Sequence, residues 1–390
     1  MATAIARLRL TVPATAVALV VATAAPAVPA EAAAVEPSDG APVVTRPSIA
    51  DRVKLDALLM IDATHAGGVF ENAGRERGSA AVRRARLGAG VELGPRLEAE
   101  LSVGSRTEEE SVELQELSFG YRASKVNALV LGLVKQPFGL ENLSSSSRLR
   151  TLERSVATNA FAPDRGAGLV WSIDGSGNYS AVGLFVDPDE REAREVAART
   201  TWALVDDDRA LVHVGASAAY RDNAGLTYRI GDEGGVDDGE NVVRSAKLAP
   251  EGVATLGLEL AWARDSLSAQ TELFARRLSG GADGEPTFTG AYVQGGWVLG
   301  GGRRKYAKGR FGSVTGGRLA RPVELVAGAG LVDLTFDGRG DRARQYVLGA
   351  NVRLGEHLRL AGQLQRLVVE DADGAVDSGS GASLRVQLDL

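Results

Sequence analysis

The last nine residues, "ASLRVQLDL" at 382–390, alternate between small or apolar side chains and polar ones. Successive side chains of an extended chain point to opposite faces, so this stretch has one apolar face and one hydrated face. The two faces consist of Leu384, Val386, Leu388 and Leu390 on one side and Arg385, Gln387 and Asp389 on the other. The pattern predicts a β-strand that separates an apolar medium from water.

The same period of two recurs along most of the chain. It is clear in "QYVLGANVRL" (345–354), "HLRLAGQL" (357–364), "VATLGLELAWA" (253–263) and "SAQTELFA" (268–275). Similar segments lie near 52–64, 79–92, 95–105, 112–122, 127–136, 166–174, 177–186, 200–206, 210–220, 288–300 and 323–334, and we expect a strand or two within 222–250. These are about sixteen strands, each close to the 9–11 residues that a tilted strand needs to cross a bilayer.

The connections between these segments are of two kinds. Tight polar turns such as 355–357 contrast with long acidic loops after Asp187 and Ile230 and at 337–341. Short turns at one end and long loops at the other are typical of outer-membrane barrels. No stretch beyond residue 34 has 18 consecutive apolar residues, so we expect no helical span there. We therefore predict an all-β fold, a transmembrane antiparallel β-barrel of about sixteen strands.

A soluble β-sandwich is the alternative, because it also alternates, with its apolar residues inward. Arg, Glu and Gln recur on the polar face, which suits a water-filled lumen, and the chain ends on an apolar residue, as barrel-assembly signals do. Aromatic residues make up only 5% of the chain, which leaves little for interfacial girdles. A secreted, soluble β-rich protein that binds glycans therefore stays open as a second interpretation.

The N-terminus has the layout of a secretory signal peptide. Arg7 and Arg9 precede an apolar run at 12–24, and small residues follow up to Ala34. We predict a signal peptide at 1–34, a flexible segment at 35–50 and a barrel at 51–390. A retained membrane anchor is the alternative, although the run is short for a span. Export and a barrel together predict the outer membrane as the location.

The composition excludes several kinds of function. The chain has 390 residues and no cysteine, which excludes disulfides and thiolate metal sites. His65, His213 and His357 are scattered, so we expect no metal site, and no motif indicates a cofactor. No Gly-x-Ser-x-Gly elbow or Ser–His–Asp arrangement is evident, so we do not expect an enzyme. The formal net charge of -6 argues against nucleic acid as a partner.

The strand pattern breaks at "LVKQPFGLENLSSSSRLRTLERSVATNAFAPDRGAG" (133–168). Pro137 and Gly139 interrupt it, four serines follow at 144–147, and the arginines of the next part are Arg148, Arg150, Arg154 and Arg165. Sixteen strands leave an aqueous channel unless something narrows it. Serine hydroxyls can replace part of the hydration shell of an ion, and guanidinium groups bind anions in forked pairs. Arginine is therefore suited to select anions in a pore.

Several segments resemble one family, the phosphate-selective porins O and P. The most distinctive match is "LGLVKQPFGLENLSSSSRLRTLERS" (131–155). Further matches are "RRARLGAGVELG" (83–94), "FAPDRGAGLVW" (161–171), "YVQGGWVLGGGRRKY" (292–306), "VELVAGAGLVDL" (323–334) and "YVLGANVRLGEHLRLAGQLQRL" (346–367). The chain departs from the family at Gly300 and Gly301, where Thr-Gly-Glu is usual, and at Leu390, where Phe is usual. The resemblance covers about 50–390.

The resemblance implies an outer-membrane porin that lets small anions diffuse passively, with phosphate or a related oxyanion as the solute. It also implies a homotrimer, the barrel-assembly machinery as a partner, and contact with outer-membrane lipid and lipopolysaccharide. In such porins the loop at about 138–165 is expected to fold inward as a constriction loop. We accordingly expect an anion pathway that includes Ser144, Ser145, Arg148, Arg150, Arg154 and Arg165. The alternative is a short helix at 148–155 whose charges pair only locally.

Alternation adds wall residues to this pathway. In "AVRRARLG" (81–88), Arg84 and Arg86 are expected to face the channel, and Arg83 to lie near a membrane interface. Lys135 lies where the loop turns inward, and its facing is open. Three acids, Glu98, Glu100 and Glu116, are expected in the lumen, where they can pair with Arg84 and Arg86 and weaken anion selectivity. A general, non-selective diffusion porin is therefore the alternative within the same fold.

Overall fold

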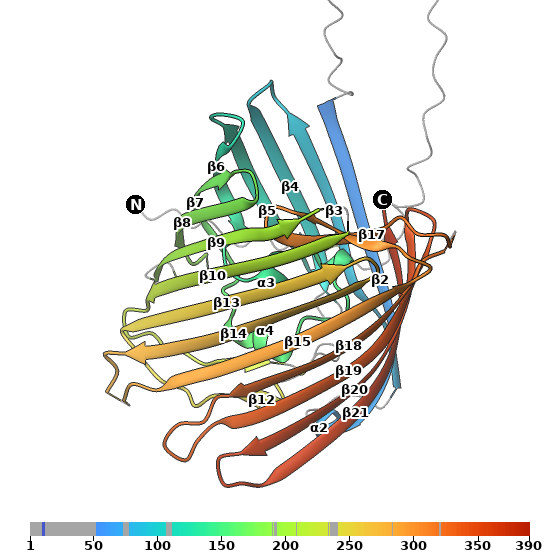
Figure 1. Ribbon diagram of the computed structural model, residues 1–390. Helices are drawn as coiled ribbons and strands as arrows, with labels where there is room; N and C mark the ends of the chain where they lie inside the picture. Colours follow the sequence, from blue (N-terminus) through green and yellow to red (C-terminus); the bar gives the residue numbers. More distant parts are fainter. Residues whose placement is uncertain are drawn as a thin grey trace, which may run out of the picture.

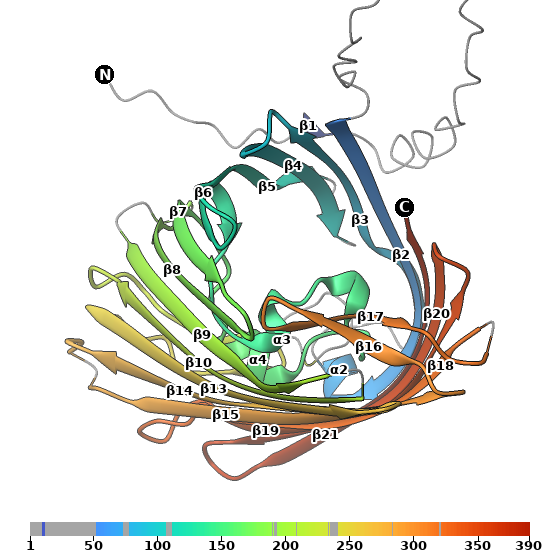
Figure 2. The ribbon, with the colours of Figure 1, turned by 45° about the horizontal axis from the view of Figure 1, so that its top comes forward.

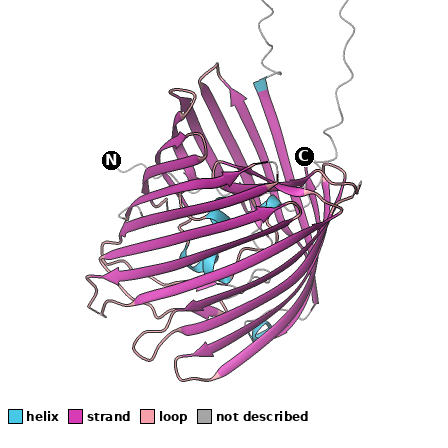
Figure 3. Ribbon diagram, viewed as in Figure 1, coloured by secondary structure: helices cyan, strands magenta, loops and turns pink. Residues whose placement is uncertain are grey.

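The structure is a computed structural model that describes residues 10–11, 52–72, 78–106, 111–188, 190, 193–207, 209–232, 234, 241–282, 284–319 and 321–390. The predicted signal peptide (1–34) and flexible segment (35–50) lie outside these residues, apart from Leu10–Thr11. The chain forms a closed antiparallel β-barrel (Figures 1 and 3). The main sheet has 17 strands, and one of them, β1, has only two residues. The other sixteen form the barrel, so the predicted fold class is confirmed.

The barrel strands follow the chain, and each pairs with its neighbours. They are β2 (Val53–Gly68), β3 (Gly78–Glu92), β4 (Leu97–Arg106), β5 (Ser111–Arg122), β6 (Asn127–Lys135), β7 (Arg165–Asp174), β8 (Asn178–Val186), β9 (Arg194–Asp206), β10 (Ala210–Asp222), β13 (Gly252–Arg264), β14 (Leu267–Ser279), β15 (Thr287–Leu299), β18 (Val323–Asp333), β19 (Asp341–Leu354), β20 (Leu358–Asp371) and β21 (Val376–Asp389). Pairing of β2 with β21 closes the ring, and β1 (Leu10–Thr11) pairs with β5. Closure matters because every backbone N–H and C=O in lipid needs a partner.

The side chains alternate as the sequence predicted, with the apolar face outward. In β13 the outward Leu256 and Leu258 are 60% and 58% exposed, whereas the inward Glu259 is 4% exposed. An apolar exterior and a polar interior are the reverse of a sandwich, because a sandwich buries its apolar face. The sandwich alternative is therefore wrong.

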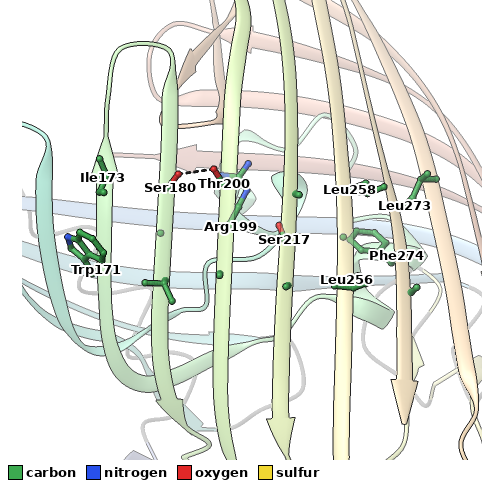
Figure 4. A pocket seen from close by; sticks show the side chains of 17 residues that line it. Trp171, Ile173, Ser180, Arg199, Thr200, Ser217, Leu256, Leu258, Leu273 and Phe274 are labelled. Carbon is green, nitrogen blue, oxygen red and sulfur yellow. Dashed lines mark hydrogen bonds between the residues drawn. The ribbon is translucent and has the colours of Figure 1, made fainter. Parts of the chain in front are cut away.

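A hollow of about 670 Å³ lies in the outer wall over β7–β10, β13 and β14 (Figure 4). Bulky outward side chains such as Trp171, Leu256 and Leu273 surround small ones, and Ser180 and Thr200 share a 2.8 Å hydrogen bond between their hydroxyls. Because its lining is almost wholly apolar and faces outward, we assign this hollow to the lipid and not to a polar solute.

The ends of the barrel differ less than the sequence predicted. Six of the connections at the end that carries the C-terminus are short turns, but the seventh spans 300–322 and contains the hairpin of β16 (Arg303–Ala307) and β17 (Arg310–Thr315). The prediction of a strand or two within 222–250 is also wrong for the barrel, because no barrel strand lies in the described part of that segment. The described part of that connection holds only β11 (Gly231–Asp232) and β12 (Val243–Arg244), which pair with each other. We call the two ends the turn end and the loop end.

The interior of the barrel is filled in part by its own connections (Figure 2). The segment 136–164, here called the plug, contains α3 (Leu140–Leu143), the 3-10 turn η2 (Ser146–Arg148) and α4 (Val156–Phe161). The hairpin β16–β17 lies beside it, and a short helix α2 (Val69–Asn72) follows β2. Within the described residues no helix has the length and hydropathy of a membrane span.

An apolar cluster inside the barrel holds the plug in place. Phe138 and Phe161 of the plug stack on Phe274 of β14, with ring centroids 6.1 and 5.9 Å apart. Val156 and Phe288 are also fully buried in this cluster. Burying an aromatic side chain stabilises a structure by about 1.5–3 kcal/mol, so the plug has a small core of its own.

Candidate functional site

The inner wall of the barrel has a buried half and a hydrated half. On β13 to β21 the inward polar side chains are covered by the plug; Glu272, Arg385 and Gln387 are at most 3% exposed. On β2 to β7 several of them are in contact with water, although Asp62 and Arg83 are buried. Exposed fractions of the side chains are 51% for Asp56, 29% for Glu116, 24% for Arg86 and 21% for Arg165. A hydrated passage therefore follows the β2–β7 wall, and the plug forms its opposite side.

Ion pairs attach the plug to the strands that close the barrel. Arg385 donates to both carboxylate oxygens of Asp62, at 2.7 and 2.6 Å, and to Glu153 of the plug at 2.6 Å. Arg83 donates to the same Glu153 carboxylate at 3.2 Å. Burial raises the pKa of Glu153, but the two arginines outweigh it, so that the net pKa lies well below the ordinary value. Glu153 is therefore a charged structural anchor.

Arg83 was expected at a membrane interface, and that expectation is wrong. The pairing of β2 with β3 shifts by one residue between Met60 and Ile61, so Arg83 is the extra residue of a β-bulge. A bulge reverses the facing of the residues on one side of it. Arg84 and Arg86 pair with the buried Met60 and Leu58, so they lie on the inward face.

Arg150 lies in the buried part of the plug. Its Nη1 donates to the carbonyl and the hydroxyl of Ser268 at 3.1 and 2.7 Å, and its guanidinium lies 4.9 Å from the ring centroid of Phe311. Burial, and after it the positive charge of the nearby Arg304, lower the pKa of Arg150 to about 10. Because Arg150 is only 4% exposed, the structure places it against the wall and away from the hydrated passage.

The serines that were expected to touch ions are partly used within the plug. The hydroxyl of Ser144 donates to the carbonyl of Leu140 at 3.0 Å, and the residue is buried. Ser145 and Ser147 share a hydrogen bond of 3.1 Å. Ser144 therefore caps the end of α3, whereas Ser145 keeps partial exposure.

Lys135 and Arg154 meet at the base of the plug. Lys135 Nζ and Arg154 Nη2 both donate to the carbonyl of Asn142, at 2.6 and 3.3 Å. Arg154 also donates to the carbonyls of Glu141 and Ser144, at 3.3 and 2.9 Å. The carbonyl oxygens satisfy these donors, so two basic side chains meet on one acceptor here. Lys135, whose facing was open, thus points to the plug.

Arg84 and Arg165 extend this basic cluster along the wall. Both lie within electrostatic range of Lys135, as does Arg154. Arg165 has a long contact of 3.9 Å to Glu116, and Arg86 one of 3.5 Å to Asp56. We call these five basic side chains, Arg84, Arg86, Lys135, Arg154 and Arg165, the basic wall.

The acids of the passage pair differently from the expectation. Glu98 is 3.4 Å from Arg122, Glu116 is nearest to Arg165, and Arg86 takes Asp56 as its partner. Among the described residues, the acid that pairs with Arg86 is therefore Asp56 and not one of the three expected glutamates. All three observed contacts are 3.4 Å or longer and hydrated, so they neutralise the cations only weakly.

Two further arginines face the passage from inside the barrel. Arg148 of the plug is exposed and forms no ion pair with a residue that the structure describes. Arg310 of the hairpin donates to the carbonyl of Leu143 at 3.0 Å and lies near Arg148 and Glu116. Burial lowers the pKa of Arg310. Sequence reasoning missed Arg310, although a Lys-Gly turn at Lys308 and Gly309 between two alternating runs is a hairpin signal.

The comparisons with known proteins agree with this geometry. The family model of the phosphate-selective porin O and P matches residues 53–390. No curated protein sequence matches the chain. The anion-selective porin from Comamonas acidovorans is 11% identical with a TM-score of 0.57, and the match covers 87% of this chain and 99% of that porin.

Two more solved structures have the same fold. The outer membrane channel DcaP of Acinetobacter baumannii is 12% identical with a TM-score of 0.55, over 87% of this chain and 97% of that one. The trimer form of OmpT from Vibrio cholerae is 8% identical with a TM-score of 0.53, over 86% and 100%. At such identities the likeness shows the fold, and the family model carries the relationship. The chain belongs to the phosphate-selective porin O and P family.

Proposed function

We propose that this outer-membrane porin conducts small anions along the basic wall. The positive side chains of this wall favour anions over metal cations such as potassium. The observation that carries the proposal is the hydration of Arg86 and Arg165 on the β2–β7 wall, each with a single distant acid, together with the exposed Arg148 of the plug. An excess of fixed positive charge in a narrow aqueous pore raises the local concentration of anions and repels cations.

Oxyanions fit the wall better than halides do. Each guanidinium offers a planar fork of N–H donors that matches two oxygens of a phosphate or carboxylate. Arg148 and Arg310 add two such forks where the plug and the hairpin meet. We infer that phosphate or a related oxyanion binds transiently there and slows the chloride that shares the passage.

The passage also contains acids, which favour the second candidate, a general diffusion porin. Asp56, Glu98 and Glu116 all face water, and each lies near one arginine of the wall or rim. If their charges cancel those of the basic wall, the pore passes both signs of ion. The two candidates differ in the sign and size of the reversal potential in a salt gradient.

The decisive experiment is a planar-bilayer recording of the folded protein with Arg86, Arg148 and Arg165 replaced by Gln. We expect the ratio of chloride to potassium permeability to fall roughly threefold, since three positive charges leave a narrow site. The matched control is Arg277→Gln, because Arg277 lies on the outer face and is paired with Glu285. An unchanged reversal potential in the triple variant would refute the proposal and favour the general porin.

A second recording tests the oxyanion. We expect millimolar phosphate to reduce the chloride current of the wild type and to have less effect on the triple variant. Equal currents with and without phosphate would leave anion selection intact and remove the oxyanion preference.

We also propose that the porin is a homotrimer and that the barrel-assembly machinery inserts it. The trimer form of a structural neighbour supports the homotrimer.

A further inference from the structure

The outward faces of β19, β20 and β21 change from mainly apolar to mainly polar near the loop end, along one line. From the turn end, the outward residues of β20 are Leu358, Leu360, Gly362 and Leu364, and the next is Arg366. On β19 the outward series Leu354, Val352, Ala350, Leu348 and Tyr346 ends at Arg344. On β21, Leu384 and Ala382 are followed by Ser380 and Ser378. Arg366 lies in register with Tyr346 of β19 and Ser380 of β21, and Arg344 with Leu331 of β18 and Val368 of β20. The two arginines therefore lie at the loop-end margin of the apolar belt, with single apolar residues beside them.

This line lies where the outer leaflet has its headgroups. Ten residues separate Arg344 from the turn-end residue Leu354, which is the length that a tilted strand needs to cross the bilayer. The short turns of such barrels are periplasmic, so Arg344 and Arg366 lie on the outer side.

The two arginines lie close together and carry uncompensated charge. Arg366 pairs in register with Tyr346, which places Arg344 diagonally across from it, at about 7–8 Å between such positions. Arg366 donates to the hydroxyls of Ser380 and Ser378 at 3.3 and 3.1 Å. Neither arginine has an acidic partner among the residues that the structure describes. By contrast, the neighbouring Arg342 is 3.0 Å from Asp333 and 3.6 Å from Glu370.

An apolar groove starts directly below them. It has a volume of about 920 Å³, its ridges are Leu348, Leu364 and Leu384, and its floor includes Ala350, Gly362 and Ala382. The ridge residues are 61% to 67% exposed. Leu348 and Leu364 are one outward step below Tyr346 and Arg366 along their strands. A phosphate-binding pair thus continues into a channel wide enough for acyl chains.

We propose that Arg344 and Arg366, with Tyr346, Ser378 and Ser380, form a binding site for the phosphorylated glycolipid of the outer leaflet, the lipid A part of lipopolysaccharide. The arginines bind a lipid phosphate in charge-assisted hydrogen bonds, and acyl chains occupy the Leu348–Leu364–Leu384 groove. The site is on the outside of the barrel, so it does not depend on which solute the pore conducts. Positive charge beside an apolar groove complements an anionic lipid, whereas the nearest acids of this face, Asp333 and Glu370, are already in contact with Arg342.

The test uses the full mature protein folded in detergent and titrated with diphosphoryl lipid A, with bound lipid counted by native mass spectrometry. We expect the wild type to hold diphosphoryl lipid A roughly tenfold more tightly than dephosphorylated lipid A. The variant R344Q/R366Q is expected to lose that preference. Arg277→Gln, an outward arginine at the loop end that is paired with Glu285 at 2.8 Å, is the control and should behave as the wild type.

Three results would overturn the proposal. The first is equal binding of the two forms of lipid A to the wild type, a comparison that needs no variant to fold. The second is displacement of lipid A by millimolar inorganic phosphate alone, which would make the site one for the free ion. The third is a fluorescent probe at position 364 that brominated lipid chains fail to quench, because a second copy then covers the groove. The chain has no cysteine, so Leu364→Cys carries a single probe. We expect the brominated chains to quench its fluorescence.

Discussion

Arginine has three separate roles in this barrel, and its surroundings decide between them. Arg385 is a buried anchor with two carboxylates, Arg150 is a buried donor to a serine, and Arg165 faces water with one distant acid. A guanidinium is charged in all three settings, but only a hydrated one can exchange its water for a passing anion. Position relative to the plug therefore matters more than the residue type.

The anchor at Arg385 supports a prediction about stability. Replacing Arg385 with Met leaves the carboxylates of Asp62 and Glu153 buried without their main partner, and we expect a loss of about 3–5 kcal/mol in the free energy of unfolding. The exposed pair of Arg209 and Asp265 is the control; Arg209→Gln should change stability by about 0–1 kcal/mol. Denaturant unfolding followed by tryptophan fluorescence measures both. Equal losses would show that the Arg385 pair is no more than a surface contact.

Glu153 also makes the anchor sensitive to acid. Its folded pKa lies well below the ordinary glutamate value of about 4.3, so its contribution to stability is complete above that value and is lost as the pH falls through the folded pKa. We expect the wild type to lose stability as the pH falls below about 4. Glu153→Gln should be less stable at pH 7 and should show a flatter dependence in that window. Parallel pH profiles of the two proteins would contradict this assignment.

Part of this residue-level arrangement could be predicted from the sequence. Parity along β3 placed Arg84 and Arg86 inward, because side-chain direction in a strand follows from counting by two. The same count misplaced Arg83, because a β-bulge adds one residue that no local pattern announces. The burial of Arg150 was also out of reach, since its partner Ser268 is 118 positions away.

At the scale of elements, the two inserted segments differ in how visible they are. The plug interrupts the alternation with Pro137, Gly139 and four serines, so its departure from the wall was predictable. The hairpin β16–β17 lies between the expected strands at 288–300 and 323–334, where the sequence analysis expected no strand. Its place inside the barrel depends on tertiary contacts, namely Arg304 with both oxygens of Glu324 at 2.7 and 2.6 Å and Tyr306 with His213 at 2.6 Å.

Removal of the hairpin should widen the pore. We consider a variant in which 302–316 is replaced by a two-residue turn and Glu324→Gln avoids an unpaired buried carboxylate. We expect the barrel to fold, since β15 and β18 pair without the hairpin, and the single-channel conductance to rise roughly twofold. Glu324→Gln alone keeps the hairpin and is the control for the lost charge. Conductance equal to that control would mean that the hairpin does not narrow the passage.

At the scale of the whole molecule, the barrel is acidic but its passage is basic on one side. The formal net charge is -6, so acids outnumber bases over the whole chain, whereas the basic wall lies within the barrel. Selectivity by fixed charge acts over the Debye length, which is about 10 Å at 0.1 M salt and about 3 Å at 1 M. The passage is therefore governed by its own wall at any salt and by distant loops only at low salt.

This difference in range gives a last prediction. If the basic wall selects anions, the ratio of chloride to potassium permeability should be highest near 0.1 M salt and should fall toward unity at 1 M, because screening shortens the reach of each guanidinium. Reversal potentials measured across gradients centred on the two concentrations give this ratio. The triple variant at Arg86, Arg148 and Arg165 should show a weaker dependence on salt than the wild type, because it keeps only Arg84, Lys135 and Arg154 of the basic wall. A ratio that is the same at both concentrations in the wild type would mean that size, and not the charge of the basic wall, determines which ions pass.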